Sequence, residues 1–189
     1  MVDFEKDIEE CLKVLKSGGL ILYPTDTVWG IGCDATNDEA VGKIYKLKKR
    51  SDEKALIVLV ADEREVLQYV AGPDLQVFTY LEEQTKPTTV IYQNAIGLAE
   101  NLVAKDGSIA IRICNDIFCR HLIKRFRKPI VSTSANIAGQ PAPGTFSGII
   151  DYIKNGVDYI VNYRSSDESI AKPSAIIKWE NGLITVIRP

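Results

Sequence analysis

The sequence is poor in the side chains that form metal centres and catalytic triads: among 189 residues it has one histidine and four cysteines. The cysteines, Cys11, Cys33, Cys114 and Cys119, form no CxxC pair, so the sequence indicates neither a zinc site nor a disulfide scaffold, and we expect buried, reduced thiols. His121 stands among basic residues on a predicted helix, which indicates a surface position. No Ser/His/Asp grouping or Walker A lysine is present, so hydrolytic triads and P-loop nucleotide hydrolases are unsupported.

Long apolar runs are also missing. Residues 1–7 are acidic, and no segment approaches the ~20 consecutive apolar residues of a membrane span, so we expect a cytosolic protein without a signal peptide. The formal net charge is only -2, which gives no reason to expect nonspecific binding to nucleic acid or membrane. The hydrophobic content of 46% and the chain length suit one domain, which we expect to span residues 1–189.

Apolar periodicity predicts helices and strands that alternate along the chain. Helical patterns cover residues 3–17, 37–49, 62–69, 73–84, 116–126 and 146–154. Strand-like runs cover residues 20–23, 55–60, 88–92, 108–113, 129–132, 159–161, 175–179 and 183–188, with a hairpin turn at Asn181-Gly182 and a loop after Pro24. This order predicts an α/β fold with one twisted, mixed sheet and flanking helices.

The predicted loop from Tyr23 to Gly32 combines one proline, two threonines, one aspartate and two glycines. Short hydroxyl side chains beside flexible backbone suit a polar ligand. The same composition suits a turn in which Asp26 and the threonines bond their own backbone, and both interpretations stay open. The Gly-Ile-Gly element lacks the third glycine of a dinucleotide-binding fingerprint.

Lys43, Lys46 and Arg50 repeat at helical spacing and could form a phosphate clamp. A solvated helix end that complements the helix dipole would look the same. Lys54, just before the next predicted strand, places another cation at an element end, where ligands tend to gather. The sequence therefore leaves two interpretations of this basic stretch.

Two further features involve predicted strand ends and strand interiors. Polar residues fill 132–136, directly after an apolar strand, and their donors could converge on an anion or a nucleotide. Capping of a helix by Ser134 or Asn136 is the alternative, although one cap needs only one such residue. Arg112 interrupts an apolar strand, where an unpaired guanidinium would be costly, so it needs an anionic partner. That partner is either a protein carboxylate or a ligand carboxylate.

Four motifs together resemble the YrdC/Sua5 family in its short, single-domain form: Tyr-Pro-Thr-Asp-Thr-Val-Trp-Gly at 23–30, Lys-Lys-Arg at 48–50, Ala-Ile-Arg at 110–112 and Ser-Thr-Ser-Ala-Asn at 132–136. The resemblance spans the whole chain. It implies a twisted sheet around a deep, basic cavity that binds ATP and L-threonine side by side. It also implies a reaction of ATP, L-threonine and bicarbonate that yields threonylcarbamoyl-AMP and pyrophosphate, after which partner proteins transfer the group to tRNA.

The resemblance assigns roles to eleven residues. Positions that hold threonine, with Arg112 on its carboxylate, are matched by Thr27, Arg112, Ser134 and Ser174. Positions that line the nucleotide are matched by Lys48, Arg50, Lys54, Ser108, Ser132, Asn136 and Arg188. Mg²⁺ is expected to accompany the triphosphate. No motif residues pair a nucleophile with a base, so we expect catalysis by substrate positioning, without a catalytic side chain or a covalent intermediate.

The chain departs from the family pattern at residues 85–89, at Ala55, and at residues 172–175, where Lys-Pro-Ser-Ala replaces Gly-x-x-Ser-Thr. The last departure removes one hydroxyl beside the implied threonine site. Two other functions therefore stay open: a related enzyme that adenylates a different amino acid or carbamoyl donor, and a double-stranded RNA or ribosome-associated binding protein.

Overall fold

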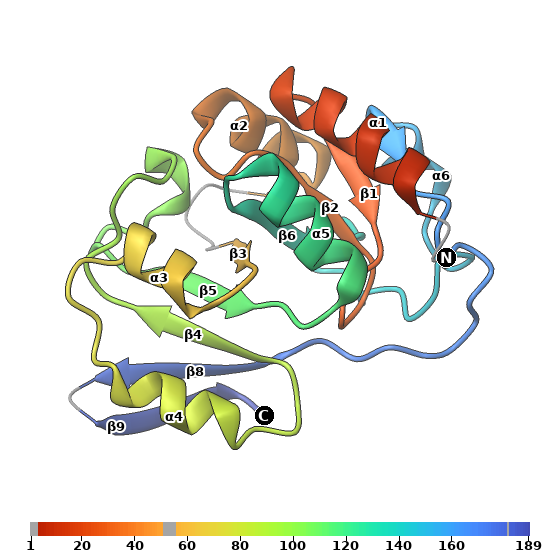
Figure 1. Cartoon of the computed structure of the whole chain (residues 1–189). Helices are drawn as coiled ribbons and strands as arrows, with labels where there is room; N and C mark the ends of the chain where they lie inside the picture. Colours follow the sequence, from red (N-terminus) through yellow and green to blue (C-terminus); the bar gives the residue numbers. More distant parts are fainter. Residues whose placement is uncertain (1–3, 51–55, 181) are drawn as a thin grey trace.

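The computed structural model describes residues 4–50, 56–180 and 182–189. Its strands form one mixed sheet in the order β7-β1-β2-β6-β3-β5-β4-β8-β9 (Figure 1). Neighbours β1/β7, β3/β5 and β4/β8 run parallel and the other pairs antiparallel. The strand bounds are β1 Ile21–Tyr23, β2 Gly30–Gly32, β3 Ile57–Val60, β4 Thr88–Tyr92, β5 Ile109–Ile113, β6 Ile130–Ser134, β7 Tyr159–Ile160, β8 Ala175–Glu180 and β9 Leu183–Arg188.

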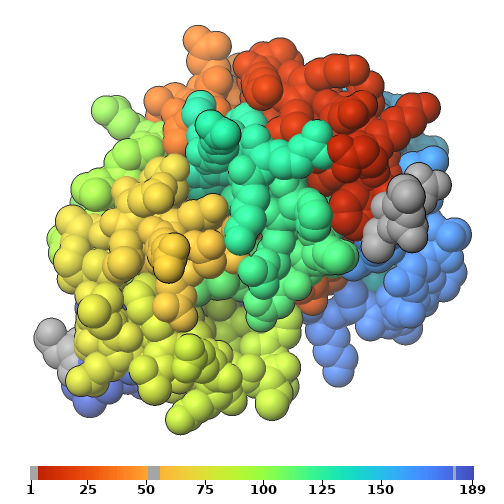
Figure 2. Space-filling model, in the orientation of Figure 1, coloured from red at the N-terminus to blue at the C-terminus, as the bar shows by residue number. Residues whose placement is uncertain are grey.

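The structure confirms most of the helices predicted from the sequence. They are α1 Glu5–Lys16, α2 Asp38–Leu47, α3 Glu63–Tyr69, α4 Gln76–Glu82, α5 Ile117–Phe126 and α6 Asp151–Lys154, with a 3-10 turn at Glu100–Leu102. Asn37 caps α2 as predicted, because its side chain accepts from the amide of Ala40. Helices α3, α4 and α5 cover one face of the sheet, and in the space-filling view their atoms hide the strands behind them (Figure 2).

Strand β2 falls inside the segment predicted to be a loop. Glycine is depleted in strands, so a Gly-Ile-Gly run gives no strand signal. The structure needs both glycines: a Cβ at Gly32 would lie 2.6 Å from the Tyr23 ring, and one at Gly30 would lie 2.9 Å from Ser132 Oγ. Close packing of strands β1, β2 and β6 therefore decides this element, and the prediction of a continuous loop was wrong.

Three other boundaries differ from the prediction. Only Asp151–Lys154 of the helix expected at 146–154 is helical, since Ser147 and Gly148 lie in a turn region before it. Strand β6 continues through Ser134, so much of the polar run at 132–136 belongs to the strand rather than following it. The predicted positions Lys54, Ala55 and Asn181 lie outside the described residues.

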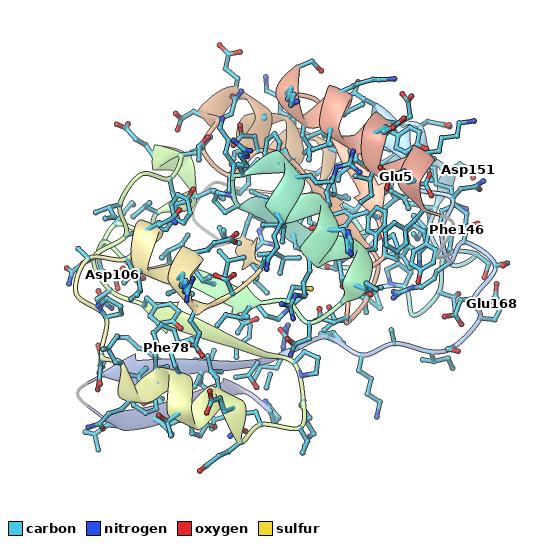
Figure 3. The ribbon with its side chains drawn as sticks, in the orientation of Figure 1. Glu5, Phe78, Asp106, Phe146, Asp151 and Glu168 are labelled. Carbon is cyan, nitrogen blue, oxygen red and sulfur yellow. The ribbon has the colours of Figure 1, made fainter. Side chains whose placement is uncertain are left out.

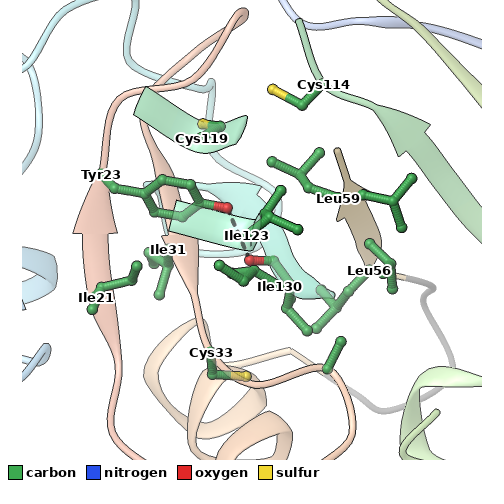
Figure 4. Packing of buried hydrophobic residues seen from close by; sticks show 14 of the residues in the cluster. Ile21, Tyr23, Ile31, Cys33, Leu56, Leu59, Cys114, Cys119, Ile123 and Ile130 are labelled. Atoms are coloured by element: carbon green, nitrogen blue, oxygen red, sulfur yellow. Dashed lines mark hydrogen bonds between the residues drawn. The ribbon is translucent and has the colours of Figure 1, made fainter. Parts of the chain in front are cut away.

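The core lies between the sheet and its helices. In Figure 4 the Tyr23 ring lies between Cys119 and Ile31, and its hydroxyl donates to the carbonyl of Val131 at 3.1 Å. All four cysteines are buried and free, as predicted, and His121 is exposed, as predicted. Among the described residues, no helix combines the length and the apolar character needed to cross a bilayer.

A long connection joins β7 to β8 across the molecule (Figure 1). Figure 3 places Glu168 on this connection, at the end of the molecule away from α4 and Phe78. The connection begins beside β1 and ends at Ser174, which is buried. It therefore brings residues from late in the chain to the segment that follows β1.

Candidate functional site

A cavity of about 480 Å³ opens on the face of the sheet opposite α3, α4 and α5. Alternation along β5 defines this face: Ala110 and Arg112 line the cavity, while Ile111 points into the core beneath the helices. Neighbouring strands contribute Ile91 and Ile176 to the same wall. The sheet itself therefore forms the floor of the candidate site.

The cavity gathers most of the residues that the sequence singled out. Eight of them line it: Thr27, Arg50, Arg112, Ser132, Ser134, Asn136, Ser174 and Arg188. They come from the loop after β1, the end of α2, strands β5, β6 and β9, and the connection before β8. Segments far apart in the sequence thus meet at one place.

Arg112 is almost completely buried, with 2% exposure. Its Nη2 donates to Asp26 Oδ1 at 2.9 Å and to Thr27 Oγ1 at 3.2 Å. A protein carboxylate therefore provides the partner that its burial demands. Its Nε is also buried but has no hydrogen-bond partner in the described structure, so the guanidinium keeps a donor for a ligand while Asp26 balances its charge.

The loop of residues 24–28 is shaped by its own threonines. Thr25 Oγ1 accepts from the amide of Thr27 at 3.0 Å and lies 2.9 Å from the carbonyl of Val28, to which it donates. The two threonine hydroxyls are 3.0 Å apart. The turn interpretation and the ligand interpretation are thus compatible, because Thr25 builds the turn and Thr27 faces the cavity.

The end of β6 contributes hydroxyls and one amide. Ser132, Ser134 and Asn136 all line the cavity. Asn136 Nδ2 donates to the carbonyl of Gln140 at 2.7 Å, whereas its buried Oδ1 lacks a hydrogen-bond partner in the described structure. Like Arg112 Nε, this acceptor is a polar atom that a ligand could satisfy.

Lys48 supports the cavity from behind. It is 1% exposed, and its Nζ donates to the carbonyls of Ser134 and, at 2.6 Å, Asn136. Its own carbonyl accepts from the amide of Ala138 at 2.9 Å. Burial, together with the nearby charge of Arg50, lowers the pKa of Lys48 to about 7. The structure thus places its ammonium on protein carbonyls.

Three arginines give the cavity its charge. Arg50, Arg112 and Arg188 line it, and no carboxylate does among the described lining residues. Burial lowers the pKa of Arg50, and burial and then the charge of Arg112 lower the pKa of Arg188. The charged forms of Arg50 and Arg188 are therefore destabilised by their surroundings, so an anionic ligand would relieve an existing cost.

Ser174 lies where the connection from β7 reaches β8. Its Oγ is 2.8 Å from Thr89 Oγ1, and its carbonyl accepts from Arg188 Nε at 2.8 Å. Ala175 follows it as the first residue of β8. Residues 172–175, where the sequence departs from the family pattern, therefore lie beside the cavity wall.

Other predicted residues lie elsewhere. Ser108 Oγ donates to Asp106 Oδ1 at 2.6 Å in the turn before β5, and Ser108 is outside the residues that line the cavity. Lys43 donates to the carbonyl of Gly18 at 2.7 Å, near the end of α1. Lys46 is exposed. The predicted three-cation helix face is therefore not a clamp at this cavity, and only Arg50 of that set reaches it.

Sequence reasoning missed the apolar part of the site and Gln140. The apolar residues that line the cavity are Val28, Leu56, Ile57, Ile91, Ala110, Ala142, Pro173, Ile176 and Ile187. Ordinary strand patterns hide such residues, since a strand facing a cavity and a strand facing a core carry the same side chains. Apolar side chains beside a few polar groups are the usual lining of a small-molecule site.

No group of three or more His, Cys, Asp or Glu side chains that could hold a metal occurs within residues 4–50, 56–180 and 182–189. Mg²⁺ bound with a triphosphate takes most of its ligands from phosphate oxygens and water. The amide oxygen Oδ1 of Asn136, which has no hydrogen-bond partner in the described structure, is the kind of oxygen ligand that Mg²⁺ binds. The donor set therefore fits a metal that arrives with a nucleotide.

Comparison with known proteins agrees with the motif pattern. A family model described as Telomere recombination, which covers Sua5, YciO and YrdC proteins, matches residues 13–189. The threonylcarbamoyl-AMP synthase of Vibrio campbellii is 32% identical over 174 residues, which cover 90% of this chain and 93% of that protein. That of Idiomarina loihiensis is 34% identical over 162 residues, which cover 84% and 86%.

Among solved structures, P. abyssi Sua5 complexed with L-threonine has a TM-score of 0.86 at 20% identity. The match covers 98% of this chain, which spans only 54% of that Sua5 chain. This likeness confirms the fold. Together with the family match, it establishes that this chain belongs to the Sua5/YciO/YrdC family.

Proposed function

We propose that this chain is an L-threonylcarbamoyladenylate synthase, which carries out the first step of threonylcarbamoyladenosine formation in tRNA. The observation that carries the proposal is the single cavity that joins Arg112, with its unpartnered Nε, to Arg50, Arg188 and Asn136. The names of the relatives at 32% and 34% identity support it. Partner proteins would transfer the product to tRNA.

The amino acid would bind on the side of Arg112. Its carboxylate would accept from the unpartnered Nε of Arg112, and Thr27, Ser134 and Ser174 would surround the rest of the molecule. Asp26, which accepts from Arg112 at 2.9 Å, would keep the guanidinium oriented. This side of the cavity therefore recognises a carboxylate and small polar groups.

The nucleotide would bind on the side of Arg50 and Arg188, with Ser132 and Asn136 as further polar contacts. The family resemblance adds Lys54, which lies outside the described residues. Lys48 and Ser108 would act indirectly, by holding the backbone beside the cavity and before β5. Mg²⁺ would accompany ATP and offset the charge of its phosphates. Asn136 Oδ1, which has no hydrogen-bond partner in the described structure, is the protein oxygen that would coordinate it.

The chemistry requires alignment more than a nucleophilic side chain. The amine of threonine and bicarbonate combine with loss of water to give an N-carboxylate. Its oxygen attacks the α-phosphorus of ATP while the bond to the bridging oxygen breaks and pyrophosphate leaves. Positioned donors and three arginine charges lower the cost of bringing these anions together.

The test is mass detection of threonylcarbamoyl-AMP after incubation with ATP, Mg²⁺, bicarbonate and threonine. ATP–pyrophosphate exchange should require threonine and bicarbonate together. Rapid exchange with threonine in bicarbonate-depleted buffer would contradict the proposal, because the amino acid's own carboxylate would then be adenylated. A salt titration of RNA binding tests direct contact with RNA, since binding through many phosphates weakens steeply with salt.

One observation favours a second candidate, a related enzyme for another amino acid. Ala175, next to the cavity residue Ser174, carries no hydroxyl. Comparing threonine with other small amino acids in the same product assay decides between the two. The variant Ala175→Thr restores the missing hydroxyl. Because Ala175 is not among the lining residues, a change of amino-acid preference in this variant would show that this position acts on the substrate through its neighbour Ser174.

A further inference from the structure

Arg164 lies on the connection between β7 and β8, but it is not among the residues that line the cavity of the proposed reaction. Its φ is 62°, a left-handed conformation that is costly for a residue with a side chain. It stands in a turn, because the amide of Ser165 donates to the carbonyl of Asn162 at 3.0 Å. Strained backbone of this kind persists where the surrounding contacts hold it in place.

The guanidinium of Arg164 supplies such contacts. Its Nη2 donates to the carbonyl of Thr25 at 2.6 Å, and its Nη1 donates to Asp116 Oδ2 at 2.6 Å. The Arg164 side chain is 30% exposed, whereas that of Asp116 is 6% exposed. Arg164 thus joins the loop after β1 to the start of α5 with two short, charge-assisted bonds.

Asp116 and Cys119 fix the other end of this link. Asp116 Oδ1 accepts from the amide of Cys119 at 3.0 Å, which caps α5. Cys119 Sγ in turn lies 3.3 Å from the carbonyl of Pro24, to which it donates. The loop of residues 24–28 is therefore tied to the first turn of α5 at both Pro24 and Thr25.

From Thr25 the contacts continue to the proposed amino-acid site. Thr25 Oγ1 accepts from the amide of Thr27 at 3.0 Å, and Thr27 Oγ1 accepts from Arg112 Nη2 at 3.2 Å. The same Nη2 donates to Asp26 in this loop. A shift of the Thr25 backbone would therefore move Thr27 and Asp26, the two groups that orient Arg112.

We propose that Arg164 is a positioning residue, which sets the loop of residues 24–28 and through it the orientation of Arg112 toward the amino acid. The inference rests on the proposed function for the identity of the ligand. It predicts a selective effect, because Arg50 and Asn136 on the nucleotide side are held by other elements of the fold. Arg164 itself is not among the residues that line the cavity.

The test compares Arg164→Met with Arg164→Lys and with the control Arg125→Met. Arg125 is also a paired arginine of similar exposure, 40% against 30%, but its partner is Glu5 on α1. In Arg164→Met the KM for threonine should rise about tenfold while the KM for ATP stays within about twofold, because a small misplacement of a positioning group is costly. Arg164→Lys should recover part of the loss, since one ammonium cannot reproduce two diverging donors.

A double variant sharpens the test. In a Thr27→Val background, Arg164→Met should raise the KM for threonine less than in the parent, because one of the two contacts through which it acts, that of Thr27 Oγ1 with Arg112, is already removed. Additive effects, or equal losses for threonine and ATP, would overturn the positioning role. Where Arg164→Met does not fold, Arg164→Lys carries the same comparison.

Hydrogen exchange without substrates separates this inference from the proposed function. The amide of Thr27 should exchange faster in Arg164→Met than in the parent, whereas the amide of Val131, which donates to the carbonyl of Cys33, should be unchanged. Equal exchange at Thr27 in both proteins would refute the positioning role. If the parent makes no threonylcarbamoyl-AMP but the difference at Thr27 persists, the proposed function fails and the positioning role stands.

Discussion

Two walls of the cavity are held in different ways. The loop of residues 24–28 takes its shape from Thr25, whose hydroxyl contacts groups only two and three residues away. The segment of residues 134–138 has its carbonyls held by Lys48, from 86 and 88 residues earlier in the chain. The first wall therefore has local bonds made by its own threonine, whereas the carbonyls of the second are held by a lysine from a distant part of the chain.

The two walls also share a principle. Each is fixed to the rest of the fold by a basic side chain that donates to backbone carbonyls: Arg164 to Thr25 in the first wall, and Lys48 to Ser134 and Asn136 in the second. A carbonyl accepts such a bond in only a few positions, so these contacts specify where the backbone lies. Basic residues near this cavity thus divide into those that line it and those that hold its walls.

The largest effect is expected at the first wall. Arg112→Ala should lose about 2–5 kcal/mol of threonine binding, because it removes a buried charged donor, while ATP binding changes little. Calorimetric titration with each ligand measures both. Asp26 is left without its partner in this variant, so Arg112→Ala with Asp26→Ala is the control for folding. Unchanged threonine affinity in a folded variant would show that Arg112 serves only its ion pair.

Substitutions of Arg50 test the role of a cation that lines the cavity beside the second wall. Arg50→Ala should weaken ATP binding by about 1.5–3 kcal/mol, the scale of a hydrogen bond to a charged group. Arg50→Lys should recover only part of this, because a planar two-point donor differs from a point charge. Nucleotide titration of the three proteins gives the answer. An unchanged ATP affinity in Arg50→Ala would mean that the end of α2 is only a solvated surface.

A substitution of Lys48 tests the role of the side chain that holds the backbone of the second wall. Lys48→Met should lower the free energy of unfolding by about 1–3 kcal/mol, because two buried carbonyls lose their donor. Chemical denaturation measures this loss. Turnover should fall more than ATP affinity, since Ser134 and Asn136 shift with their backbone. An equal loss of ATP affinity and turnover would instead place Lys48 on the nucleotide.

The same variant makes a prediction about pH. Burial lowers the pKa of Lys48 from 10.5 to about 7 in the folded protein. Between these values the unfolded chain binds a proton that the folded chain does not, so stability should rise with pH in this window. The difference in stability between the parent and Lys48→Met should therefore grow from pH 7 towards pH 10. A constant difference would contradict the lowered pKa.

The smallest effect is expected from Thr25→Val. This change removes the hydrogen bonds of the Thr25 hydroxyl in the first wall, while the valine side chain has nearly the same shape as threonine. We expect a loss of about 0.5–1.5 kcal/mol of stability, the usual net contribution of one hydrogen bond. Thermal unfolding measures it, with Thr36→Val as a matched control because Thr36 also bonds a nearby side chain, Asp34. No loss in Thr25→Val beyond that of the control would mean that Arg164 alone shapes the loop.

The local sequence pattern was sufficient to predict most of the secondary structure. It failed at elements whose conformation is decided by packing against distant parts of the chain. The α2 helix and its Asn37 cap follow from residues within one turn of each other, so they could be predicted. Strand β2 could not, because Gly30 and Gly32 are needed only to admit the Tyr23 ring and Ser132 from other strands. The expected helix at 146–154 shortened to Asp151–Lys154 in the same way, since its first part lies in an irregular turn region.

The sequence by itself determined the family and most of the polar residues that line the cavity, because the motifs at 23–30, 48–50, 110–112 and 132–136 each carry polar side chains at element ends or inside apolar strands. Only the tertiary structure decided which cations line the cavity. Arg50 lines the cavity, whereas Lys48, two residues earlier, bonds the backbone behind it. The physical reason is direction: neighbouring residues at a helix end point different ways, and what each one meets depends on distant strands.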